Sequence, residues 1–144
     1  MRKTGFRLDQ VLKYRKEMEK VSKVEFAEAS QELENANTFL KCEEEKVSRL
    51  DSEFMDRQQK GITAHELQIY SSFFRMKSVD FKCQRTNIGL LDHEVARKRE
   101  TLIDASKGKK MLESLEKKSV REMQRHIAEK EKNLMEEIAI RGRK

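Results

Sequence analysis

Proline and tryptophan are absent from the chain, and glycine occupies only five of its 144 positions. Proline breaks helices and glycine weakens them, so little in this sequence interrupts long helices. Apolar residues make up 36% of the chain and aromatic residues 6%, whereas 40% of the residues are charged. This charge content, with apolar residues at helical spacing, is typical of a coiled coil. Two packed helices touch along one row of side chains, the seam, so we expect only a small core.

Long apolar runs are missing as well. No stretch of roughly 18 apolar residues exists, so we expect no membrane-spanning helix and no direct membrane insertion. Arg7 and Asp9 interrupt the apolar core that a signal peptide needs. The only cysteines, Cys42 and Cys83, are too few for a disulfide framework in a chain of this length. They either lie near one another across a hairpin or, as we favour, are buried or half-buried reduced thiols of a cytosolic protein.

Motifs of catalysis are also absent. The sequence has no phosphate-binding P-loop, no dinucleotide fingerprint and no nucleophile elbow. The histidines His65, His93 and His126 are scattered and have no neighbouring cysteine, so no metal site is expected. Basic runs could contact phosphate, but residues 96–144 contain no aromatic residue to stack on bases, so no nucleic-acid binding is expected. We expect a non-enzymatic protein without a cofactor.

One strong break divides the helical pattern, at residues 61–67. Gly61 suits the position after a helix that needs a positive φ. Thr63 and Glu66 then form a capping box, and Ile62 and Leu67 occupy the positions of a hydrophobic staple. The chain therefore stops one helix and starts another within a few residues.

Heptad spacing of apolar residues continues on both sides of this break. The sequence thus predicts an all-α fold, a long antiparallel two-helix coiled-coil hairpin whose C-terminal helix is longer. We expect one elongated unit over residues 1–144, with the first helix at about 8–58, a turn at 59–63 and the second helix at about 64–141.

The predicted seam can be followed residue by residue. In the first helix it runs through Phe26, Ala29, Leu33, Ala36, Leu40, Glu43, Val47, Leu50 and Phe54. In the second it runs through Leu67, Tyr70, Phe74, Lys77, Phe81, Gln84, Ile88, Leu91, Val95, Lys98, Leu102, Ala105, Lys109 and Leu112. It continues through Gly89 and Gly108 without a break.

Two shifts of phase interrupt this regular spacing. Before Phe26, an apolar series runs one residue out of phase, which predicts a stutter. Its members are Val11, Tyr14, Met18 and Val21. A second stutter, through residues 112, 116 and 120, follows in the longer helix.

The unequal helix lengths leave the end of the second helix without an intramolecular partner. With the turn near residue 61, residue 26 faces about residue 97, and the last 25 residues or so extend up to roughly 38 Å past the first helix. An apolar stripe follows this extension: Val120, Met123, Ile127, Leu134 and Ile138. It either forms a binding surface or frays in the isolated protein.

A second apolar stripe lies just after the turn. Ile69, Phe73 and Met76 fall at helical spacing beside the seam, although a two-stranded coiled coil needs only one. The stripe is either a widened seam packed on Phe54 and Met55, or a docking patch for a protein partner.

Charge divides the hairpin in the same way. Residues 1–20 hold seven basic and three acidic side chains, and residues 96–144 hold fifteen and nine. Residues 21–95 hold ten basic and fourteen acidic side chains. A hairpin with both termini at its base thus carries about +10 there and about −4 toward its tip, and such a distribution steers different partners to each end.

Four stretches, in order along the chain, resemble the FliJ family of flagellar protein export components. They are FRLDQVLKYRK at 6–16, GITAHELQIY at 61–70, KRETLIDASK at 98–107 and EEIAIR at 136–141. The stretch at the turn and RETLIDASK are the most specific. The resemblance spans essentially the whole chain.

The resemblance implies a fold, a location and partners. Members of the family are antiparallel two-helix coiled coils similar to the central stalk of rotary ATPases, and their motifs define no catalytic residue. They are cytoplasmic and associate peripherally with the membrane through the flagellar type III export apparatus. They dock in the hexameric ring of the export ATPase, promote its assembly and activity, contact the cytoplasmic domain of the export gate and engage export chaperones.

We place these partners by hypothesis. We expect the ATPase ring to contact a set that we call the base residues: Arg7, Val11, Tyr14, Arg15, Lys117, Lys118, Arg121, Ile127, Leu134 and Ile138. We expect the gate or the chaperones to contact a set that we call the tip stripe: Ile69, Tyr70, Phe73 and Met76. The alternatives are the stalk of a virulence-type secretion system, and a general coiled-coil scaffold that dimerises through the extension.

Overall fold

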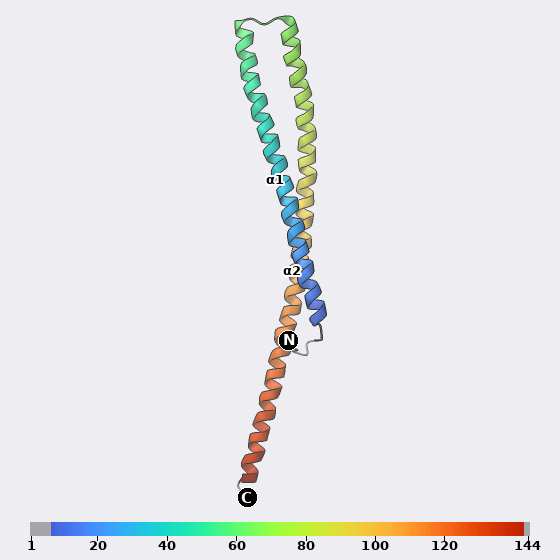
Figure 1. Cartoon of the computed structure of the whole chain (residues 1–144), viewed down its shortest axis with the longest axis vertical. Helices are drawn as coiled ribbons and strands as arrows, with labels where there is room; N and C mark the ends of the chain where they lie inside the picture. Colours follow the sequence, from blue (N-terminus) through green and yellow to red (C-terminus); the bar gives the residue numbers. More distant parts are fainter. Residues whose placement is uncertain (1–6, 143–144) are drawn as a thin grey trace. The chain divides into compact units, whose positions relative to one another are not determined.

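The structure, a computed structural model, describes residues 7–142, which form two long helices and a short connection (Figure 1). Helix α1 covers Asp9–Lys60, 52 residues, and α2 covers Ala64–Gly142, 79 residues. No strand occurs within residues 7–142. The fold is the predicted antiparallel two-helix coiled-coil hairpin with a longer C-terminal helix.

The turn follows the capping chemistry expected from its sequence. Gly61 has a φ of 108°, which side-chain-bearing residues rarely adopt, and its N–H donates to the Arg57 carbonyl at 2.9 Å. The hydroxyl oxygen of Thr63 accepts from the Glu66 N–H at 3.1 Å, so Thr63 caps α2. The Glu66 carboxylate lies 3.9 Å from Arg57, on the other side of the turn.

The helices pack in two compact units, and each is described by itself. The unit Lys23–Glu100 contains the turn and most of the buried apolar side chains, which are Ala29, Leu40, Phe81 and Val95. Its interhelical pairings are antiparallel, since Phe54 stacks on Tyr70 and Glu43 pairs with Lys77. Every predicted seam residue of α1 from Phe26 to Phe54 is buried or half-buried here.

The predicted α2 seam is confirmed in the same way. From Tyr70 to Leu112 each of its positions is buried or half-buried, including the lysines, and only Leu67, beside the turn, is exposed. Contacts within the Lys23–Glu100 unit also fit the expected register. Arg99 lies over the Phe26 ring, with its guanidinium carbon 5.6 Å from the ring centroid.

The second unit holds the chain up to Ser22 together with the chain from Thr101 onward, and here the predicted stutter in α1 is wrong. Val11, Tyr14, Met18 and Val21, which were expected in the seam, are all exposed. The buried side chains are Leu12, Glu19 and Ser22, which keep an unbroken heptad spacing up to Phe26. The apolar pattern misled because polar residues occupy the seam in this stretch.

In this unit the Arg15 side chain of α1 lies beside Gly108 of α2. Helix α2 continues through Gly108, as expected. A Cβ atom placed on Gly108 would lie 3.2 Å from the Arg15 guanidinium, so the missing side chain leaves room for that group against α2. The stutter predicted in α2 would bury Val120 in place of Ser119. Both residues are half-buried, so this stutter stays a prediction.

The last part of α2 extends beyond the seam. Every residue from 121 to 142 is exposed, and in Figure 1 the part of α1 that belongs to the same unit does not lie beside this orange and red segment. The extension was therefore predicted correctly. The cysteines were not, because Cys42 and Cys83 are free but exposed rather than buried.

Candidate partner-binding surfaces

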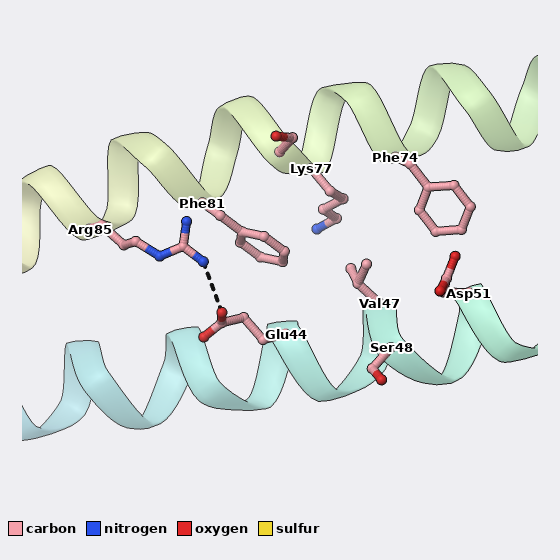
Figure 2. Close-up of a pocket in the computed structure, with 9 residues that line it drawn as sticks. Glu44, Val47, Ser48, Asp51, Phe74, Lys77, Phe81 and Arg85 are labelled. Carbon is pink, nitrogen blue, oxygen red and sulfur yellow. Dashed lines mark hydrogen bonds and ion pairs between the residues drawn. The ribbon is translucent and has the colours of Figure 1, made fainter.

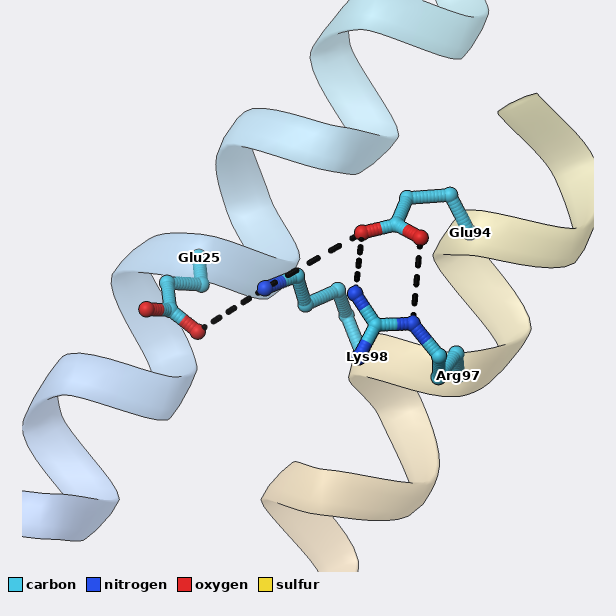
Figure 3. Close-up of polar contacts among 4 residues, drawn as sticks. All are labelled: Glu25, Glu94, Arg97 and Lys98. Carbon is cyan, nitrogen blue, oxygen red and sulfur yellow. Dashed lines mark hydrogen bonds and ion pairs between the residues drawn. The ribbon is translucent and has the colours of Figure 1, made fainter. Parts of the chain in front are cut away.

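Ion pairs hold the two helices in register within the Lys23–Glu100 unit. Lys98 of α2 reaches the Glu25 carboxylate of α1 at 3.1 Å and also lies beside Glu94, which Arg97 holds through two hydrogen bonds (Figure 3). The hydrogen bond from Arg97 lowers the pKa of Glu94. The Lys98–Glu25 pair places a carboxylate of α1 against a cation of α2.

A second pair shows the same arrangement closer to the turn. The Glu43 carboxylate accepts hydrogen bonds from Lys77 at 3.2 Å and from Lys46 at 3.4 Å, and these two bonds lower its pKa. One seam residue nearby is less well satisfied. The Oε1 atom of Gln84 is buried and has no hydrogen-bond partner among the residues that the structure describes. Polar residues at seam positions cost stability but fix the register.

The most buried charge in the described chain lies in the other unit. Glu19 is only 7% exposed, and its carboxylate accepts from the Ser106 hydroxyl at 2.7 Å and from Lys109 at 2.9 Å. The bond to Glu19 raises the pKa of Lys109. A buried carboxylate persists only when it is paired and hydrogen-bonded, and α2 supplies both partners.

The tip stripe, Ile69, Tyr70, Phe73 and Met76, divides into two kinds of residue. Tyr70 belongs to the seam, where its ring stacks on Phe54 at 4.7 Å, and Phe73 is half-buried with its ring against Phe74 at 5.9 Å. Ile69 and Met76 are 56% and 54% exposed. A widened seam accounts for the two aromatic rings but not for the two aliphatic side chains. Met55, expected to help cover them, is itself exposed.

The base residues all belong to the unit that contains the chain up to Ser22 and from Thr101 onward. Each of them is exposed in the structure: Arg7, Val11, Tyr14, Arg15, Lys117, Lys118, Arg121, Ile127, Leu134 and Ile138. Their exposure leaves them free to meet a partner.

A neighbouring part of this surface lies outside the predicted seam and the predicted stripes. Met111 and Leu115 are exposed and line a shallow groove of about 470 Å³ on α2, among the lysines Lys107, Lys110 and Lys118. Their spacing of four residues places both on one face of α2 and could have indicated this surface. Neither residue was predicted as a site residue, because both lie outside the seam positions.

Two general properties complete the description. No helix in the described residues is long and apolar enough to cross a membrane. Within residues 7–142, no group of three or more histidine, cysteine, aspartate or glutamate side chains could hold a metal ion.

The fold places the chain in the class of two-helix coiled-coil proteins. The family model described as "Flagellar FliJ protein" matches residues 4–143, essentially the whole chain. The chain belongs to the FliJ family, whose members are non-enzymatic, cytoplasmic components of the flagellar export apparatus. No curated protein and no solved structure gives a significant match.

Proposed function

We propose that the chain is a stalk that inserts into the hexameric ring of the flagellar export ATPase and promotes its assembly and activity. The observation that carries this proposal is the segment 121–142, in which every residue is exposed although an apolar stripe runs along it. An apolar stripe at heptad spacing on an isolated helix is a surface that a partner can cover. Basic residues of the same unit, Lys117, Lys118 and Arg121, would guide a partner of opposite charge.

The tip stripe supplies the second half of the proposal, contact with the cytoplasmic domain of the export gate or with export chaperones. Ile69 and Met76 offer exposed aliphatic surface, and the half-buried Phe73 ring is fixed between them by the aromatic cluster around Phe54. Rigid apolar side chains lose little entropy on binding, which suits them to an interface. Through these contacts the protein would lie at the cytoplasmic face of the membrane without entering it.

The ATPase proposal is tested with the purified export ATPase. Its rate of ATP hydrolysis is measured with and without the full-length chain, at fixed ATPase concentration and increasing stalk concentration. We expect the rate to rise and to saturate, because a ring assembled around a stalk holds its active sites together. A rate that does not change at any concentration would remove the ring-insertion proposal.

The tip proposal is tested with two substitutions of different structural cost. Met76→Ala removes only exposed surface, whereas Phe73→Ala also removes a contact with Phe74. Both should weaken binding of the purified gate domain, measured by calorimetry, while circular dichroism shows unchanged helicity. Val24→Ala, which trims an equally exposed side chain of α1, is the control and should bind like the unaltered chain. Unchanged gate affinity in both tip variants would contradict the assignment.

A further inference from the structure

A groove opens between α1 and α2 within the Lys23–Glu100 unit (Figure 2). It has a volume of about 450 Å³, and both helices line it. The seam residues Val47, Phe74 and Phe81 form its apolar surface, while Asp51 and Ser78 stand among its polar lining residues. In Figure 2 the Asp51 carboxylate points toward α2, beside the Phe74 ring.

The groove lies where one interhelical ion pair is missing. In an antiparallel coiled coil, long charged side chains beside the seam pair across it and cover it. At one end of the groove this happens, since Arg85 reaches Glu44 at 2.9 Å. Asp51 lies one heptad after Glu44, and Ser78 lies one heptad before Arg85, so these two should form the next pair. Serine carries no charge and is too short to cover the seam.

The missing partner leaves the exposed Asp51 carboxylate unpaired across the seam. The two cations that line the groove are already engaged, Arg85 by Glu44 and Lys77 by Glu43. The side chain of Asp51 has no hydrogen bond or ion pair with any residue in the described range 7–142. A carboxylate beside half-buried aromatic rings is complementary to a side chain with an apolar stem and a cationic head, because the stem can lie on the rings while the head meets the carboxylate.

We propose that this groove is a docking site for an amphipathic helix of a partner protein that inserts an arginine or lysine between α1 and α2. The inserted cation takes the place that the residue at position 78 leaves vacant, and pairs with Asp51. Apolar residues one turn away on the partner helix cover Phe74 and Val47. A helix lying along such a groove converts this part of the hairpin into a three-helix coiled coil.

This surface is distinct from the tip stripe and the base residues. In the heptad frame of α2, Ser78 and Arg85 lie on one side of the seam, and Phe73 lies on the other. None of Ile69, Phe73 or Met76 lines the groove. The inference therefore stands whether or not the gate and ATPase proposals hold.

The test uses the full chain and two synthetic three-heptad peptides. One peptide carries a leucine stripe flanked by arginines, and the other carries glutamates in place of the arginines. Like charges beside the stripe keep each peptide from pairing with itself. Binding is measured by calorimetry, and the contact is located by the amide NMR shifts of the chain.

The variants separate the groove from general charge effects. Ser78→Arg supplies the missing ion pair and fills the groove, so the hairpin should keep its stability while its affinity for the arginine peptide falls at least tenfold. Ser52→Arg adds the same charge to the exposed surface of α1, outside the groove lining, and is the control. Asp51→Lys should reverse the preference, so that the glutamate peptide binds in place of the arginine peptide.

The expected result is that the arginine peptide shifts the amides of Ser48, Asp51 and Ser78, and that only Ser78→Arg and Asp51→Lys abolish these shifts. Equal binding of the two peptides, or shifts confined to residues outside the groove, would overturn the proposal. Sedimentation equilibrium tests the remaining occupant, a second copy of the chain. A self-association that Ser78→Arg abolishes and Ser52→Arg does not would assign the groove to that copy and also overturn the proposal.

Discussion

A chain that ends after Val120 keeps its helical hairpin but no longer stimulates the export ATPase. The hairpin should survive because residues 121–142 are all exposed and add nothing to the seam. Stimulation should be lost because the truncation removes the apolar stripe that we propose for the ring. The measurement is the ATP hydrolysis rate at saturating chain concentration, which should return to the rate of the ATPase alone.

Substitutions within the extension separate its surface from its length. Ile127→Ser, Leu134→Ser and Ile138→Ser together remove the stripe but keep the helix continuous. Met135→Ser changes an even more exposed residue that points to a different side of α2, and it serves as the control. We expect the triple variant to behave like the truncated chain and Met135→Ser like the unaltered chain. Full stimulation by the truncated chain would show that the ring contacts other residues.

Leu40→Ala should lower the free energy of unfolding by about 3 kcal/mol, the largest stability effect that we expect from a single substitution here. Leu40 is only 8% exposed and occupies the seam of the Lys23–Glu100 unit. Truncating a buried leucine removes its transfer free energy and leaves a cavity. A narrow two-helix seam has few other buried side chains to compensate.

The adjacent residue provides a stringent control for this prediction. Phe39 is the larger apolar side chain, yet it is 56% exposed, so Phe39→Ala should change stability by less than about 0.5 kcal/mol. Urea unfolding followed by circular dichroism at 222 nm compares the two variants. A cost for Phe39→Ala that equals the cost for Leu40→Ala would mean that the seam is rotated by one residue from the position described.

The sequence predicted the fold well wherever apolar residues mark the seam. From Phe26 to Phe54, and from Tyr70 to Leu112, apolar spacing alone locates the buried face. It failed between residues 11 and 22, where Glu19 and Ser22 are buried and Val11 and Val21 are exposed. Glu19 is stabilised there by Ser106 and Lys109, which lie far away in the sequence. Periodicity cannot find such a partner, because it counts apolar residues along one helix at a time.

The candidate surfaces show the same limit. The exposed positions Ile69 and Met76 could be found as apolar residues outside the seam frame. Tyr70 was predicted both in the seam and in the tip stripe, and its ring lies in the seam, stacked on Phe54. The groove beside Asp51 could not be predicted from the sequence. It depends on the exact register between the helices, which the Glu44–Arg85 pair fixes and which heptads alone leave open by a residue or two.

The polar seam around Glu19 gives the two units different resistance to local opening. In the unit Lys23–Glu100, opening would expose Leu40, Phe81 and an aromatic cluster to water. In the stretch of α1 before Lys23, the only buried apolar side chain is Leu12, and the buried polar groups can bond to water instead. Free energies of local opening follow the apolar surface that opening exposes. The first turns of α1 can therefore detach and re-form, with rapid exchange of their amide protons, while the unit that contains the turn stays folded.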